Sequence, residues 1–334
     1  MTIFRCVDCA GDSPLSFGDK GLQCSGCGRL FPNRFGGIDF SNAGKNVEND
    51  AQAQIYNGML GELSNFSTPH NLTLTHQRGL LLEHVLDGDH VLEIGGHRSG
   101  VLPFLEIKKG AVCRGIDVSA TWVAEQNRLS EIRGKGTEWT LGDAERLPFL
   151  DDSFDAVVSF DVFEHLSSVE TAVREVSRVL KVGGHLICHM PVADVDWSLD
   201  GFQRRFWGTK WRTGQESVGH FHDKMSSRKQ LIAMFHESGL EVIKSESFNV
   251  WIQPWHDHKV LPLLGRIRHG GRGVHEREAL EPADVKTSTE ANRFQLFYSK
   301  AVLPAFKAFA LVDKVGVRFG VGGSHSFVVR KRSS

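Results

Sequence analysis

The fold of this chain is decided by the stretch Gly142-Asp143-Ala144-Glu145-Arg146-Leu147-Pro148-Phe149, which runs on into Asp152-Ser153-Phe154-Asp155-Ala156-Val157-Val158-Ser159. An acidic residue ends one apolar run, a Leu-Pro-Phe turn follows, and an Asp-Asp-Ser turn begins the next apolar run. A similar boundary lies upstream, in Val91-Leu92-Glu93-Ile94-Gly95-Gly96. Short apolar runs bounded by turn residues predict buried strands, and in an open α/β sheet ligands bind beyond the carboxyl ends of such strands.

Predicted strands and helices alternate on both sides of this stretch. The strands are predicted at 90–95, 111–118, 137–141, 154–160, 185–190, 240–250 and 326–331. The helices are predicted at 75–86, 101–109, 120–132, 169–180 and 226–238. This order indicates right-handed βαβ units and a mostly parallel sheet of seven strands.

Four of the six cysteines form two pairs, Cys6-x-x-Cys9 and Cys24-x-x-Cys27. Each short turn aims two thiolates at one point, so the doubled spacing predicts a closed, structural zinc site. Two redox pairs or disulfides are the alternative. We expect the resulting ribbon to have a core of its own, so that loss of the metal would leave the sheet largely intact.

Taken together, the acidic strand ends, the Leu-Pro-Phe turn and the glycine loop resemble the class I S-adenosylmethionine-dependent methyltransferases. The N-terminal segment resembles the zinc ribbons that precede some rRNA guanine methyltransferases, that serve as separate activators of RNA and protein methyltransferases, and that precede methyltransferases in glycan gene clusters. The resemblance implies an α/β fold: a seven-stranded, mostly parallel Rossmann-like sheet with helices on both faces, a small N-terminal zinc ribbon, and helical and aromatic cap insertions. The expected domains are a zinc ribbon at 1–40, a linker and leading helix at 41–86, and a methyltransferase domain at 87–334 with caps at about 193–223 and 252–310.

The same resemblance assigns a cofactor site for S-adenosylmethionine to the strand ends. Glycines after the first strand of the sheet would let backbone N–H groups approach the amino acid carboxylate of the cofactor. His97 stands where the family has its second glycine, and the loop is also compatible with a plain strand-to-helix turn. Asp117 would accept the ribose hydroxyls and Asp143 would meet the adenine amino group, with a helix N-cap as the alternative for each. The candidate cofactor residues are Glu93, Gly95, Gly96, His97, Ser99, Gly100, Asp117, Val118, Asp143, Ala144 and Asp161.

Histidines are the candidates for removing a proton from the methyl acceptor, because their ordinary pKa lies near neutrality. His165 follows the strand at 154–160 with Glu164 beside it; the alternative is that it caps a helix and packs beside the cofactor. His220 and His222 lie in Gly219-His220-Phe221-His222-Asp223. Either could be a base or, with Asp223, bind a divalent ion; the alternative is a capped helix with surface histidines.

The nature of the acceptor depends on weaker signals. The net charge of −1 gives no overall field that would attract nucleic acid or a membrane. Aromatic and histidine residues at 193–223 would wall a pocket or form the core of the lid itself. We therefore expect a small hydroxylated metabolite or a glycan of a biosynthetic pathway, methylated on oxygen. An RNA base is the alternative, with an arginine cluster either tracking phosphates or forming a solvated loop: Arg266, Arg268, Arg272 and Arg277.

Two other classes fit the sequence less well. A nicotinamide dehydrogenase would need Gly-x-Gly-x-x-Gly in the first turn, which this chain lacks. A non-catalytic scaffold would need a cofactor pocket that stays empty, and His97 is its only support. The apolar segment at 301–312 is interrupted by Lys307 and is shorter than the roughly 20 residues of a membrane span, so we expect a soluble, cytoplasmic protein.

Overall fold

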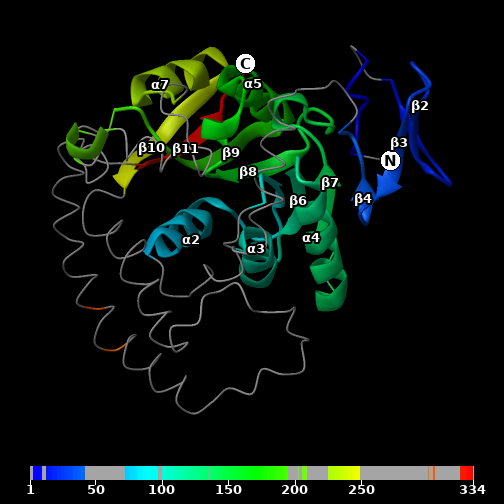
Figure 1. Ribbon diagram of the computed structural model, residues 1–334, viewed down its shortest axis with the longest axis horizontal. Coiled ribbons are helices and arrows are strands. Elements are labelled where there is room, and N and C mark those ends of the chain that lie inside the picture. The colour runs from blue at the N-terminus through cyan, green and yellow to red at the C-terminus, as the bar shows by residue number, and fades with distance from the viewer. Residues whose placement is uncertain are drawn as a thin grey trace.

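The computed structural model describes residues 3–9, 13–41, 72–96, 100–134, 136–194, 202, 205–208, 225–248, 300, 304 and 324–333. Its main body is a seven-stranded sheet with the spatial order β10-β11-β9-β8-β5-β6-β7 (Figure 1). The strands are β5 (His90–Ile94), β6 (Val112–Asp117), β7 (Glu138–Leu141), β8 (Phe154–Phe160), β9 (Leu180–Pro191), β10 (Leu240–Phe248) and β11 (Ser324–Lys331). The predicted seven-stranded Rossmann-like sheet is confirmed.

Five of these strands, β9, β8, β5, β6 and β7, run parallel, whereas β11 is antiparallel to both of its neighbours, β9 and β10. β9 begins at Leu180 rather than at residue 185, because Leu180 already pairs with Phe154 of β8. Parallel strands have their carboxyl ends at one edge of the sheet, so the segments that follow β5, β6, β7 and β8 come together there.

Helices cover both faces of the sheet (Figure 1). One apolar cluster joins the sheet to α2 (Leu72–His84), α3 (Val101–Lys109) and α4 (Ala120–Arg133). A second cluster joins the opposite face to α5 (Val169–Val179) and α7 (Arg228–Glu237). The helix ends are set locally: the Ser168 hydroxyl caps α5 by accepting from Thr171 N–H, and Ser227 and Gln230 form a capping box on α7.

The N-terminal segment forms a small antiparallel sheet of its own, with strands in the order β1-β2-β3-β4. These strands are β1 (Leu15–Gly18), β2 (Gly21–Cys24), β3 (Leu30–Arg34) and β4 (Gly37–Ile38). We call the described residues 3–9 and 13–41 the ribbon. In Figure 1 it is drawn in blue beside β7.

The ribbon continues the large sheet at its β7 edge. Asp39 forms a parallel bridge with Leu141, and Phe40 N–H donates to Leu141 O over 2.8 Å. The approach requires a glycine at position 37, because a Cβ there would lie 2.1 Å from the backbone oxygen of Trp139. The strand edge of β7 is therefore covered by the ribbon.

Aromatic rings join the ribbon and the sheet into one core. The ring centroid of Phe4 lies 5.4 Å from that of Phe149 and 5.5 Å from that of Phe40. A single apolar cluster contains these rings, ribbon residues such as Leu22, and sheet residues such as Ile116. The expectation that the ribbon has a core of its own is therefore wrong. A module of about 40 residues buries too little apolar surface to stand alone, and here it completes its core on the larger domain.

The remaining domain predictions are only partly covered by the structure. The leading helix is present as α2, whereas the linker before it and nearly all of both cap insertions lie outside the described residues. Among the helices that the structure describes, none combines the length and the apolar character needed to cross a membrane.

Candidate functional site

The loop after β5 approaches its neighbours so closely that side chains at its glycines would clash. Gly95 has φ 75°, and a Cβ there would lie 2.2 Å from Val162 Cγ2, in the segment after β8. At Gly96 a Cβ would lie 1.4 Å from Trp122 Nε1, at the start of α4. Glycine thus allows three strand-end segments to meet at one place.

Two features of this loop fit a polar ligand group. The backbone at Gly95 and Gly96 carries no side chains, so a ligand group can approach it closely, although both N–H groups are donated within the protein, to Ile116 O at 2.9 Å and to Asp117 Oδ2 at 2.6 Å. The indole N–H of Trp122 is buried and has no acceptor among the described residues. Gly100 follows with φ 61° and precedes α3, and Glu93 is buried in β5. S-adenosylmethionine, with its amino acid end, fits these features.

Asp117, the last residue of β6, connects this loop to the next. Its Oδ2 accepts from Gly96 N–H at 2.6 Å and its Oδ1 accepts from Ser119 N–H at 2.7 Å. Ser119, not Asp117, caps α4. Burial raises the pKa of Asp117 to about 6, although the backbone N–H groups of Gly96, Ser119 and Val118 partly counteract this. A carboxylate has about four acceptor positions, so Asp117 can accept a further hydrogen bond, and its contact with the ribose hydroxyls stays a prediction.

Asp143 follows β7 and caps a helical turn, which is the role that the sequence left open beside a contact with the adenine amino group. Its Oδ1 accepts from Glu145 N–H at 2.8 Å and begins a short 3₁₀ turn, η2 (Ala144–Arg146). Glu145 Oε1 in turn accepts from the backbone N–H groups of Ser167 and Ser168, before α5. Ala144 is buried and Val118 is half-buried. A capping Asp143 keeps acceptor positions for a ligand, so its predicted adenine contact remains a prediction.

The segment after β8 carries three titratable side chains. Asp161 has φ 55°, and its N–H donates to His189 O at 2.7 Å. A second 3₁₀ turn, η3 (Phe163–His165), places His165 Nε2 3.7 Å from Glu164 Oε1. Burial raises the pKa of Asp161 and of Glu164, and for Glu164 the nearby charge of Asp161 adds to the effect.

Several predicted site residues lie outside the described residues: His97, Ser99, His220 and His222. Their predicted roles in cofactor binding, proton removal and divalent ion binding stay predictions.

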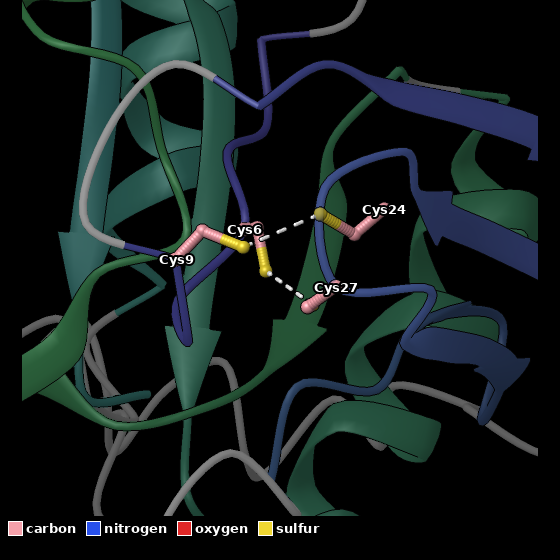
Figure 2. A group of neighbouring side chains, drawn as sticks. All are labelled: Cys6, Cys9, Cys24 and Cys27. Carbon is pink, nitrogen blue, oxygen red and sulfur yellow. Dashed lines mark hydrogen bonds between the residues drawn. The ribbon is translucent and has the colours of Figure 1, made fainter.

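The four paired cysteines come together in the ribbon (Figure 2). Their sulfur atoms all lie within 4.8 Å of one another. Cys9 Sγ lies 3.6 Å from Cys24 Sγ, and Cys6 Sγ lies 3.7 Å from Cys27 Sγ. Four thiolates bound tetrahedrally to zinc at about 2.3 Å would lie about 3.8 Å apart. The donor set and spacing therefore fit zinc.

None of the six cysteines forms a disulfide. The tight turn of the second pair depends on Gly26, where a Cβ would lie 2.3 Å from Ser13 Oγ and 3.5 Å from Cys9 Sγ. Arg146 of η2 contacts the turn of the first pair, through Val7 O and through Asp8 Oδ1 at 3.1 Å. The cluster is thus close to the main domain but belongs to the ribbon.

The sequence interpretation missed three residues beside Asp161: His189 of β9, Ser326 of β11 and His76 of α2. His189 stands near the end of β9. Its position was a usable signal, but the link to Ser326 depends on an antiparallel strand pairing that no local pattern announces.

Comparison with known proteins agrees with this geometry. Residues 92–188 match the model of a methyltransferase domain family. A ubiquinone/menaquinone biosynthesis C-methyltransferase of Paracoccus denitrificans is 33% identical over 125 residues, which is 35% of this chain and 49% of that enzyme. An O-methyltransferase of Aspergillus sclerotiorum is 25% identical over 190 residues, 54% of this chain and 66% of that protein. The chain thus spans less than two thirds of these relatives.

A solved structure shares the fold. Phosphoethanolamine N-methyltransferase 2 of Haemonchus contortus, in complex with S-adenosyl-L-methionine, superposes with a TM-score of 0.54 at 16% identity, covering 87% of this chain and 61% of that one. The match of residues 92–188, the strand order and the glycine loop point to one family. Residues 92–188 are thus similar to a methyltransferase domain, and the fold is that of a solved methyltransferase in complex with S-adenosyl-L-methionine.

Proposed function

We propose that this protein is an enzyme that methylates a hydroxyl group of a small hydroxylated metabolite or glycan in a biosynthetic pathway, using S-adenosylmethionine. The observation that carries the proposal is the meeting of strand ends at one edge of the sheet. There the glycine loop contacts Asp117 through Gly96 N–H and contacts Val162 through Gly95. Asp143 follows β7 and Asp161 follows β8, the strands that flank β6 and β5, so both lie beyond the carboxyl ends of the strands.

Each of these residues has a distinct task in the proposal. The amino acid end of the cofactor would lie against the side-chain-free loop at Gly95 and Gly96, the Asp117 carboxylate would accept the ribose hydroxyls, and Asp143 would meet the adenine amino group. When bound, the cofactor supplies a methyl group on a sulfonium, which is already a strong electrophile. The protein's main contribution would then be to hold the acceptor oxygen in line with that methyl group.

Two relatives support the proposed acceptor. The Paracoccus enzyme is named a C-methyltransferase of ubiquinone and menaquinone biosynthesis, which supports a small acceptor, and the Aspergillus protein is named an O-methyltransferase, which supports an oxygen acceptor. A hydroxyl acceptor has to lose its proton, and a base typically contributes 10²–10⁴ to the rate of such steps. The candidates from sequence are His165, His220 and His222. A divalent ion held by the latter two would be a further way to favour ionisation.

We assign the four cysteines a structural zinc ion. All four positions of a tetrahedral ion would be filled by thiolates, which leaves none for a substrate or a water molecule. The zinc would hold the ribbon together and, through the ribbon, support the β7 edge of the sheet.

Calorimetry with S-adenosylmethionine and S-adenosylhomocysteine tests the cofactor assignment. We expect both to bind to the wild type, and Asp117→Asn to bind both more weakly. Methyl transfer from labelled cofactor into small-molecule and glycan extracts, compared with purified RNA, tests the acceptor. Absence of cofactor binding would favour a non-catalytic scaffold. Transfer to RNA with affinity that falls steeply as salt rises would replace the small acceptor by RNA.

A further inference from the structure

Polar side chains from four separate elements form a chain beside the glycine loop. Nδ1 of His189, in β9, lies 2.8 Å from Oγ of Ser326, in β11. The same oxygen lies 3.1 Å from Nε2 of His76, in α2. On the other side of the imidazole, His189 Nε2 lies 3.9 Å from Oδ1 of Asp161. We call Asp161, His189, Ser326 and His76 the His189 network.

The network lies within an apolar layer. His189 is 1% exposed and Ser326 is 2% exposed. Ile187 lies two residues before His189 on β9, and Val328 lies two residues after Ser326 on β11. Both belong to the apolar cluster that packs under α2. Burying a polar side chain without a partner costs roughly 2–7 kcal/mol, and the hydrogen bonds of the network offset that cost without gaining much stability. Packing alone therefore gives no reason for polar residues here.

Hydrogen-bond chemistry gives the network a direction. The Ser326 hydroxyl has one proton, so of its two imidazole partners one has to donate and the other has to accept. The contact between His189 Nε2 and Asp161 Oδ1 is longer than a hydrogen bond, but the negative charge of an ionised Asp161 at 3.9 Å favours the tautomer of a neutral His189 that carries its proton on Nε2. Nδ1 then accepts from Ser326, and Ser326 accepts from His76 Nε2–H. Burial lowers the pKa of His76, which keeps that imidazole neutral.

Asp161 is also the member of this region that a substrate can reach. Its side chain is 32% exposed, against 6% for His165 and 1% for Glu164. Its neighbour Val162 packs against Gly95, so the carboxylate adjoins the cofactor loop. Titratable groups that interact with Asp161 include Glu164 on η3 and His189 on β9, and His165 lies beside Glu164. Although the side chain is partly exposed, desolvation by the surrounding protein raises the pKa of Asp161, which suits a group that takes up a proton near neutral pH.

We propose that Asp161 receives the proton of the acceptor hydroxyl and that His189, held by Ser326 and His76, is its positioning residue. The inference rests on the proposed methyl transfer. In that step the acceptor oxygen forms a bond to the methyl carbon, the methyl–sulfur bond breaks with its electrons going to sulfur, and the hydroxyl proton passes to a carboxylate oxygen of Asp161. His189 would act on the carboxylate electrostatically, by presenting its Nε2–H to Asp161 across 3.9 Å.

The first test needs no substrate. Nitrogen NMR of protein labelled in its histidine rings reports which ring nitrogen carries the proton, and loss of one signal in His189→Gln assigns it. We expect His189 to be protonated on Nε2, with a shift that changes as Asp161 titrates and no longer does so in Asp161→Asn. Protonation of His189 on Nδ1, or a shift that ignores the Asp161 substitution, would overturn the proposal.

The second test uses labelled methyl transfer into the extract that serves as acceptor source. We expect Asp161→Asn to lower the rate by about 10²–10⁴ and His189→Gln to lower it less. Because His189 acts through Asp161, adding His189→Gln to Asp161→Asn should cause no further loss. His325→Gln is the matched control: His325 is 3% exposed in the same strand as Ser326, but it is hydrogen-bonded to Ser245 and Ser247.

Cofactor affinity distinguishes failure of the proposed methyl transfer from failure of the His189 network. Ser326→Ala and His189→Gln should bind S-adenosylhomocysteine within about twofold of the wild type while the pH profile of transfer shifts. Wild-type protein that binds no S-adenosylhomocysteine would refute the proposed function itself. Normal binding with independent, multiplicative effects of the Asp161 and His189 substitutions would leave the function standing and refute the network.

Discussion

Replacing Asp117 by asparagine should weaken cofactor binding while leaving the free energy of unfolding almost unchanged. The substitution keeps the shape of the side chain but leaves one acceptor oxygen for the two backbone N–H groups, those of Gly96 and Ser119. Losing a charge-assisted hydrogen bond to the ribose costs about 1.5–3 kcal/mol. We therefore expect the affinity for S-adenosylhomocysteine at pH 7.5 to fall about 10- to 150-fold.

Stability should respond differently. A tenfold change in proton affinity corresponds to about 1.4 kcal/mol, so the rise of the Asp117 pKa from 3.8 to about 6 means that the ionised side chain costs the fold at most roughly 3 kcal/mol. Asparagine removes this cost but leaves one backbone N–H without its acceptor, which costs about 1–3 kcal/mol. The two effects nearly cancel, and we expect the free energy of unfolding at pH 7.5 to change by less than about 1.5 kcal/mol.

The pH dependence provides the sharper check. Because the folded pKa of Asp117 is raised, its contribution to stability is fully present below pH 3.8 and is lost as pH rises through about 6. Wild type should therefore gain stability relative to Asp117→Asn as pH falls from 7.5 to 5. Cofactor affinity of the wild type should decrease over the same range, because a protonated carboxyl offers fewer acceptor positions.

Asp155→Asn is the matched control. Asp155 lies at the amino end of β8, away from the carboxyl ends of the strands where the cofactor is proposed to bind. Asp155 accepts from Lys181 Nζ and from His90 N–H; although burial acts to raise its pKa, these partners lower it overall. Its replacement should reduce stability at neutral pH and leave cofactor affinity unchanged. Calorimetry and urea unfolding measure both quantities. Equal affinity in Asp117→Asn and wild type, or equal losses in both variants, would refute the assignment of Asp117.

Three further predictions concern the ribbon. Metal analysis should find one zinc per chain, and Cys24→Ser should lose it; full metal content in that variant would contradict the site. Gly37→Ala should cost about 1–3 kcal/mol of unfolding free energy by forcing the ribbon away from Trp139, whereas Gly136→Ala, with open space around its Cβ, should cost little. Phe4→Ala should cost about 3–5 kcal/mol in a single cooperative unfolding transition, and chelation of the metal should lower the unfolding midpoint of the whole protein. Separate transitions of ribbon and sheet would show that the common core is not cooperative.

The sequence alone predicted the strands and helices of this protein and the positions of the candidate functional residues on them. The apolar runs before Asp117 and Asp143 are local patterns with a strand's length, and they are strands in the structure. The two Cys-x-x-Cys turns are local as well, because each fixes its pair of thiolates within a single turn. Short-range periodicity and turn chemistry suffice for such features, since the residues involved are neighbours in the chain.

Only the tertiary structure decided which distant residues meet. The common core depends on Phe4 packing against Phe149, and the His189 network brings Ser326 to a strand that precedes it by more than a hundred residues. Both contacts follow from the pairing of strand edges, in which the ribbon joins β7 and β11 lies antiparallel between β9 and β10. Strand pairing joins backbones across any sequence separation and leaves no local pattern, so neither contact could be predicted from the sequence.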